Sequence, residues 1–283
     1  MSKMIWMTDI HLNVLGDNQI KKWLRYVKRC MPANIIGVCI TGDITEAPFL
    51  EEHLALMSSI LDVPIYYVLG NHDYWHSSFN EVENKCKKLR QNNDRLVWLG
   101  SAGVIQLSDS IALVGHDGWY DARNGCWEKS SYIMNDWVNV YNFHPFIAVN
   151  DGNGIFPVMD VNAIVNVARF RADAGSQYVY DQCKLALRAG NKRVIVLTHF
   201  PPFAEAARHH GSPTEDEAIP WYSSQIMGTR LLQLASEFPT QEISVFCGHT
   251  HDAYRYVASK NLEVFVGHSQ YGNPHWELFS LGE

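Results

Sequence analysis

The sequence lacks the features that mark secreted, membrane-spanning and disulfide-stabilised proteins. Among its 283 residues, no stretch of about 18 consecutive apolar residues occurs, and no basic N-terminal segment precedes a long apolar run. We therefore expect neither a membrane span nor a signal peptide. The six cysteines include no Cys-x-x-Cys pair, and Cys39 and Cys247 lie in apolar runs, so we expect reduced thiols and a cytoplasmic location.

Clustered positive charge is also scarce. The formal net charge is −7, and residues 85–90 form the longest Lys/Arg-rich run. Nucleic-acid binders depend on basic surface that displaces phosphate counterions, so a polynucleotide partner is not expected. A small phosphorylated ligand remains compatible with this charge, because bound divalent cations would add positive charge that the count omits.

Short apolar runs recur along the chain, and each ends in polar residues. Because these runs do not alternate with polar residues, they predict strands buried on both faces at residues 4–8, 35–41, 65–69, 194–198 and 243–247. Helical spacing of apolar residues fills the gaps at 20–27 and 50–61, and Pro32 and Pro64 follow these segments. The order is that of a βαβαβ unit.

The middle of the chain departs from this order. Residues 104–107 and 111–114 flank a polar turn and predict an added antiparallel hairpin, so the sheet is expected to be mixed. We expect one domain over 1–283 in which 116–192 form an insertion or cap, with an aromatic-rich stretch at 119–146, a helix at 161–171 and another ending at Gly190. Residues 203–221 are expected to form a functional loop before a helix at 224–237.

Residue types that bind metals follow the central strands. In open α/β sheets, ligands bind beyond the carboxyl ends of the strands, so these residues are expected to converge. Two carboxylates, one amide and several imidazoles form a donor set suited to Mn, Fe, Zn or Ni rather than Ca. The residues in question are Asp9, His11, Asp43, Asn71, His199, His249 and His251.

The order of these residues is more informative than any one of them. An isolated Asp-x-His is usually a surface coincidence, a Gly-Asp is usually a turn, and a lone His at a strand end is more often structural. Here Asp9-x-His11, Gly42-Asp43, Gly70-Asn71-His72-Asp73, His199 and Gly248-His249-Thr250-His251 follow one another at predicted strand ends.

In this order the sequence resembles the calcineurin-like metallophosphoesterase superfamily, and the resemblance spans residues 9–251 apart from the insertion. It implies a four-layer α/β/β/α sandwich with mixed sheets. It also implies two divalent or trivalent metal ions, one held by Asp9, His11, Asp43 and His251 and the other by Asp43, Asn71, His199 and His249. Asp43 would bridge the two ions.

The resemblance also suggests roles in catalysis. Two metal ions about 3.5 to 4 Å apart activate a water as hydroxide and neutralise phosphate oxygens. His72 would then act on the leaving-group oxygen as the general acid, and Glu46 would orient it. Ala47 stands where the protein-phosphatase branch has an Arg that contacts phosphate, which argues against a phosphoprotein substrate.

We therefore expect a metal-dependent hydrolase of a small phosphomonoester or phosphodiester. The alternatives are a nuclease of the same superfamily, which would need a basic groove, and a non-catalytic protein-binding scaffold, which would be expected to lose metal ligands. Other candidates for the site have structural interpretations as well. His116 and Asp117 would be turn residues, and the aromatic stretch would pack in the core. His209 and His210 would lie in a solvated loop. Tyr271, Asn273 and His275 are further candidates to line the pocket.

Overall fold

The apolar runs near the N-terminus form a five-stranded sheet in the computed structural model, which describes residues 2–148 and 158–282. Its strand order is β15, β1, β2, β3, β4, and only β15 is antiparallel to its neighbour. The strands are β1 (Lys3–Met7), β2 (Ile35–Thr41), β3 (Ile65–Val68), β4 (Leu96–Trp98) and β15 (Glu277–Ser280).

The later runs form a second, six-stranded sheet in the order β13, β14, β12, β9, β6, β5. The four inner strands are parallel, and each edge strand is antiparallel to its neighbour. The strands are β5 (Ile105–Ser108), β6 (Ile111–Gly115), β9 (Arg193–Leu197), β12 (Glu242–Cys247), β13 (Tyr254–Ser259) and β14 (Leu262–Val266).

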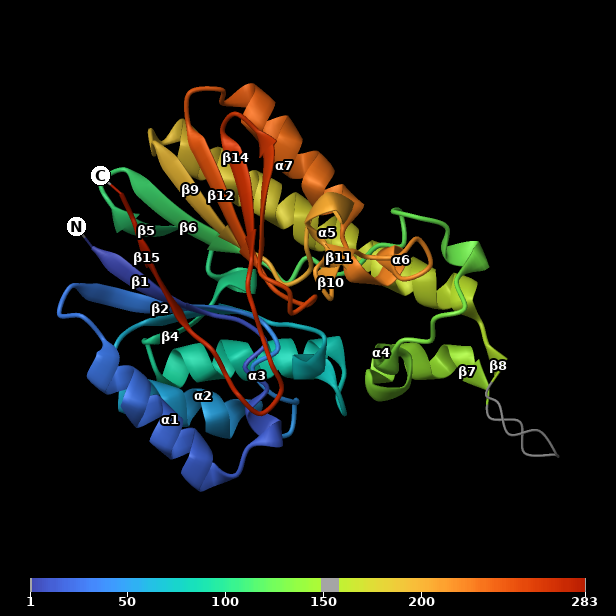
Figure 1. Cartoon of the computed structure of the whole chain (residues 1–283), viewed down its shortest axis with the longest axis horizontal. Coiled ribbons are helices and arrows are strands. Elements are labelled where there is room, and N and C mark those ends of the chain that lie inside the picture. The colour runs from blue at the N-terminus through green and yellow to red at the C-terminus, as the bar shows by residue number, and fades with distance from the viewer. Residues whose placement is uncertain (1, 149–157, 283) are drawn as a thin grey trace.

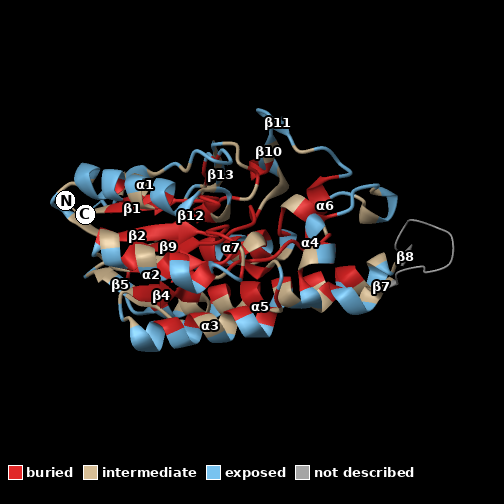
Figure 2. Ribbon diagram, turned by 90° about the horizontal axis from the view of Figure 1, so that it is seen from below, coloured by how far each residue is buried: buried red, intermediate tan, exposed pale blue. Residues whose placement is uncertain are grey.

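The two sheets pack face to face between two layers of helices (Figure 1). Figure 2 shows buried residues concentrated in the strands and exposed residues on the outer faces of the helices. One hydrophobic cluster joins the first sheet to α1 (Asp17–Cys30), α2 (Leu50–Leu61) and α3 (Phe79–Asn92), and another joins the second sheet to α5 (Val161–Arg188) and α7 (Gln225–Glu237). A third lies between the sheets. This is the expected four-layer α/β/β/α sandwich.

Short elements lie at one end of the sandwich. They are α4 (Asn135–Asn139), β7 (Ile147–Ala148), β8 (Val158–Met159), β10 (Arg208–His209), β11 (Ser212–Pro213) and α6 (Ile219–Tyr222). The predicted functional loop at 203–221 thus contains a small hairpin, since β10 and β11 pair antiparallel. None of the described helices is both long and apolar enough to cross a membrane.

Most sequence predictions of single elements are confirmed, with two corrections. The predicted hairpin forms, but its second strand, β6, also pairs in parallel with β9 and so belongs to a parallel unit as well. The two helices predicted between 161 and 190 are one continuous helix, α5, because buried Ala172, Ser176 and Val179 continue its inner face past the expected break.

The predicted insertion at 116–192 contains two structural parts. The second half of α5 packs on the six-stranded sheet and on α7, and its buried residues include Val179, Cys183 and Leu187. The aromatic stretch before it contributes Trp119, Trp137 and Phe143 to the core of the first sheet, which confirms the structural reading for those rings.

Candidate metal centre

The predicted metal ligands lie in loops that leave the ends of five parallel strands. Three of these strands, β1, β2 and β3, belong to the first sheet, and β9 and β12 belong to the second. The residues therefore converge from two packed sheets, and not from one edge of a single sheet. Their side chains meet at the floor of a cavity of about 640 Å³, which Asp43, Asn71, His249 and His251 help to line.

These loops hold several predicted ligands in a sparsely populated backbone conformation. The φ angles of Asp9, His11, Asp43, His249 and His251 are 47°, 40°, 49°, 69° and 62°. Left-handed backbone costs a non-glycine residue about 1 to 3 kcal/mol and persists only where the surrounding structure enforces it. The concentration of such residues at one point marks a functional site.

Two glycines of the motifs allow the loops to approach one another. A Cβ atom on Gly70 would overlap the Asp43 carboxylate, and one on Gly248 would overlap the Thr8 hydroxyl and the Asp9 carboxylate. The glycines in Gly-Asn-His-Asp and Gly-His-Thr-His are thus required by contacts between ligand loops.

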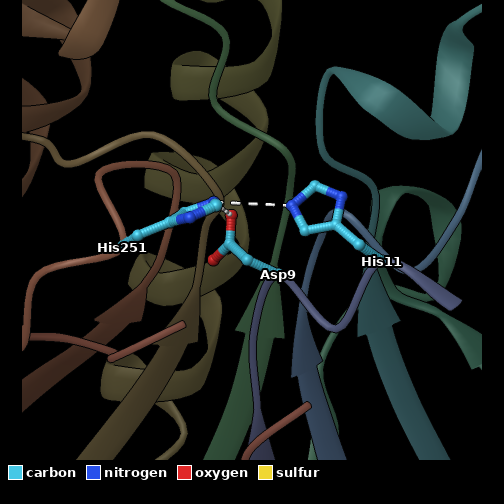
Figure 3. Close-up of side chains that lie close together, drawn as sticks. All are labelled: Asp9, His11 and His251. Carbon is cyan, nitrogen blue, oxygen red and sulfur yellow. Dashed lines mark hydrogen bonds and ion pairs between the residues drawn. The ribbon is translucent and has the colours of Figure 1, made fainter. Parts of the chain in front are cut away.

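Asp9, His11 and His251 form a first group of candidate ligands (Figure 3). His251 points toward the other two from the opposite side, with its Nε2 3.4 Å from Asp9 Oδ1 and 3.4 Å from His11 Nε2. The backbone N–H of His249 donates to both Asp9 oxygens at 3.0 and 3.1 Å, which fixes the carboxylate.

Asn71, His199 and His249 form a second group, in which two acceptors face each other. Asn71 Oδ1 lies 3.0 Å from His199 Nε2 and 3.2 Å from His249 Nδ1. His199 Nδ1 donates to the Thr41 carbonyl at 2.8 Å, so in the neutral ring Nε2 is an acceptor. Asn71 Oδ1 is also an acceptor. No hydrogen can be shared between Asn71 Oδ1 and a neutral His199 Nε2, whereas a cation beside them would satisfy both lone pairs.

Asp43 lies between the two groups. Its Oδ1 is 3.5 Å from His199 Nε2 and accepts a hydrogen bond from the His72 backbone at 2.9 Å. Its Oδ2 is 3.7 Å from His11 Nε2. Each carboxylate oxygen therefore faces a different group, as a bridging ligand requires.

Burial controls the protonation of the cluster. It lowers the pKa of His11 to about 3 and that of His72 to about 2, and it also lowers the pKa of His199 and His249. These four imidazoles are therefore neutral, which is the form that binds metals. Burial acts on His251 in the same direction, but its hydrogen bond and charge interaction with Asp9 raise its pKa. Burial, followed by the neighbouring Asp9, raises the pKa of Asp43 well above its usual value.

Asp136, which the sequence analysis missed, determines which way the Asn71 amide points. This fully buried carboxylate on α4 accepts hydrogen bonds from Asn71 Nδ2 and Trp75 Nε1, both at 2.8 Å. A carboxylate only accepts, so the Asn71 nitrogen must face Asp136 and its oxygen must face His199 and His249. No sequence pattern marks Asp136, because it comes from a separate segment rather than from a strand end.

His72 lies beside the candidate ligands, whereas Glu46 makes its contacts with other residues. The His72 ring stacks on Trp75, with centroids 3.6 Å apart, and its Nε2 lies 3.9 Å from Asp43 Oδ2. Glu46 accepts a hydrogen bond from Asn13 at 3.0 Å and lies 3.5 Å from His76. Glu46 thus contacts Asn13 and His76 rather than His72. One face of the His72 ring is covered by the Trp75 indole.

The secondary candidates separate into structural and pocket residues. Asp117 is buried and forms ion pairs with His116 and Arg171, as the structural reading predicts. His209, His210 and Tyr271 line the cavity, whereas Asn273 and His275 are not among its lining residues.

Comparison with known proteins identifies the family of the chain. The family model described as calcineurin-like phosphoesterase matches residues 2–253. The chain belongs to this family. Calcineurin-like phosphoesterases are metal-dependent hydrolases of phosphoesters, and the Asp/His groups described above are able to bind metal ions.

Solved structures share the fold of this calcineurin-like phosphoesterase. One is a dimetal phosphatase from Danio rerio, at 16% identity and a TM-score of 0.54, which covers 94% of this chain and 86% of that chain. Another is the phosphopantetheinyl hydrolase PptH from Mycobacterium tuberculosis, at 12% identity and a TM-score of 0.58, which covers 94% and 90%. A search of curated proteins finds no match.

Proposed function

We propose that this calcineurin-like phosphoesterase hydrolyses a small phosphomonoester or phosphodiester with two bound metal ions. The observation that carries the proposal is the pair of acceptors Asn71 Oδ1 and His199 Nε2, which face each other at 3.0 Å between two buried residues. Buried acceptors without donors are costly, so this arrangement is explained by a cation.

The geometry supports two ligand sets that share one residue. Asp9, His11, Asp43 and His251 would hold one ion, and Asp43, Asn71, His199 and His249 would hold the other. The separate directions of the two Asp43 oxygens favour this division. The mixed oxygen and nitrogen donors suit Mn, Fe, Zn or Ni.

When bound, the two ions supply positive charge that neutralises phosphate oxygens and lowers the pKa of a water molecule. The protein's own contribution begins with His72, which lies in the cavity wall beside Asp43. Because burial keeps this ring neutral, we propose that it donates a hydrogen bond to the leaving-group oxygen. Trp75, stacked on the ring, holds its orientation.

The walls of the cavity favour a small substrate over a polymer. No Lys or Arg is found among the described residues that line it. A nuclease would need basic side chains along an extended strand. Binding of the phosphate therefore depends on the metal ions and the imidazoles. This agrees with Ala47, which stands where the protein-phosphatase branch has an Arg.

The test is hydrolysis of nitrophenyl phosphate and bis(nitrophenyl) phosphate beside nucleotides and single-stranded DNA, with Mn added to metal-stripped protein. Metal-dependent turnover of a small ester is expected. Preferential cleavage of DNA would favour the nuclease, and complete inactivity with metals bound would favour the scaffold.

A further inference from the structure

A second cavity of about 440 Å³ lies beside the metal centre and is not explained by binding of phosphate. It shares Tyr132, His209, His210 and Tyr222 with the cavity over the candidate ligands. The two spaces therefore adjoin along a wall of rings. A phosphoester whose phosphate lies at the metal centre therefore has room for its alcohol in this second space.

Hydrogen bonds hold the chain segment that precedes Tyr132, one of the shared rings. Ser130 and Ser131 donate from their hydroxyls to the Glu217 carbonyl and carboxylate at 2.6 and 2.9 Å, which fixes the backbone next to Tyr132. On the metal side, the Tyr222 ring contacts His249, with centroids 4.9 Å apart. The wall is thus preformed and continuous with the metal centre.

The hairpin β10–β11 forms the other side. The backbone N–H of Gly211, at its turn, donates to Asp252 at 2.7 Å, and Asp252 directly follows the candidate ligand His251. The ring centroids of His209 and His210 lie 4.1 Å apart. The hairpin that carries the His209 and His210 imidazoles is therefore bonded to the loop of the candidate ligand His251.

The chemistry of the second cavity selects against a negatively charged group. Among the described residues that line it there is no Lys or Arg, and Glu215 adds negative charge, so a second phosphate or a carboxylate would be repelled. The Tyr132 ring, which lines both cavities, is 40% exposed.

We propose that this cavity binds an uncharged aromatic or heteroaromatic ring on the alcohol side of the phosphoester. Flat rings stack on tyrosine and histidine, and a ring substituent with an N–H or O–H can donate to the Glu215 carboxylate. The chemistry fits both a nucleoside and a simple aryl alcohol. This inference rests on the proposed function for the place of the phosphate.

Two pairs of substrates test the proposal, since the members of each pair differ in the ring and share the type of leaving group. Benzyl phosphate is compared with butyl phosphate, and adenosine 5′-phosphate with ribose 5-phosphate. Stacking on one ring is worth about 5- to 100-fold, so kcat/KM is expected to favour the ring-bearing member by that factor. A preference in the nucleotide pair alone identifies a nucleoside, and a preference in both identifies any aryl group.

Tyr132→Ala should reduce this preference toward equality. Tyr141→Ala is the matched control, because Tyr141 belongs to the same segment, is 47% exposed and lines neither cavity, and it should leave the preference unchanged. The absence of a preference in both pairs, or an equal effect of the two variants, would overturn the ring site while leaving the phosphoesterase proposal intact.

Binding can also be measured without turnover. Calorimetry of adenosine and benzyl alcohol with the metal-loaded protein should detect binding that weakens about 5- to 100-fold in Tyr132→Ala. If no substrate is hydrolysed but this binding is found, the proposed function fails and the ring site stands. Failure to bind either compound would contradict the ring site.

Discussion

Among single residues, Asp43 has the most demanding proposed role because its two oxygens face different ligand groups. We predict that Asp43→Asn abolishes activity more completely than any other single ligand change, since an amide adds no negative charge between two cations. Elemental analysis should show loss of both metals. Two metals per chain with near-normal turnover would refute the bridging role.

His72 can be tested through the leaving group. If its ring assists the departing oxygen, His72→Ala should slow an alkyl phosphoester about 10²- to 10⁴-fold and a nitrophenyl ester much less, because nitrophenolate departs without help. Metal content should be retained. Since His72 also lies close to His11 and Asp43, a loss of metal would instead make it a ligand.

Asp136 is predicted to act through Asn71. Asp136→Ala removes the acceptor that orients the amide and should weaken metal binding about 10- to 100-fold. Asp136→Asn can still accept from Asn71 and should restore most of the affinity, which a purely steric role would not predict. Asn139→Ala is the control, because Asn139 is a half-buried residue of the same helix that does not line the cavity. Equal metal affinity in Asp136→Ala and wild type would contradict the role.

These residues differ in how far sequence predicts them. Asp9, His11, Asp43 and the other candidate ligands could be located because each follows a buried strand within a recognisable motif. Asp136 follows no strand and matches no motif, so only the contacts of the folded chain place it beside Asn71. The contacts of Glu46 were equally unpredictable, since they depend on side-chain directions in loops.

At the level of elements, α5 joins the two halves of the site. Arg171 on this helix donates from Nε to Asp117 Oδ2 at 3.0 Å, and the Tyr74 hydroxyl donates to the same oxygen at 3.1 Å. The Asp117 carbonyl accepts from the His199 backbone at 3.0 Å. One buried ion pair thus links the loop of Asn71 and His72 to the loop of His199.

We predict that Asp117→Asn lowers the free energy of unfolding by about 3 to 5 kcal/mol, because it leaves Arg171 buried without a counter-charge. Burial alone would raise the pKa of Asp117, but Arg171 and His116 hold it below its usual value. A lowered pKa means that the ion pair stabilises the fold at neutral pH and that this contribution is lost as pH falls below about 4.

Urea unfolding at pH 7 and at lower pH measures this effect. The variant should lose less stability on acidification than the wild type. Asp173→Asn is the control, since Asp173 lies on the same helix as Arg171 and is 51% exposed. This variant should change the free energy of unfolding by no more than about 0.5 kcal/mol. Equal changes in the two variants would contradict the assignment.

The limits of the sequence prediction also differ between elements. Helices α1 and α2 were predictable because their buried residues keep helical spacing and a proline follows each. The pairing of β6 with β9 was not, because strand partners distant in sequence leave no local pattern.

For the whole molecule, the sandwich explains how ligands from five separate loops reach one point. Parallel strands in two packed sheets direct their carboxyl ends to the same side of the molecule. The contacts between α5, α7 and the six-stranded sheet support our proposal of one domain over 1–283. Within it, the proposed insertion 116–192 contributes both a core helix and the Asp136 side chain.

The central claim is that two metal ions in this cluster drive phosphoester hydrolysis. Titration of metal-stripped protein with Mn, with bound metal and nitrophenyl phosphate turnover measured in the same samples, tests it most directly. The account predicts that two ions bind per chain and that full activity requires both. Full activity with one ion or none, or two bound ions with no hydrolysis of any phosphoester, would contradict it.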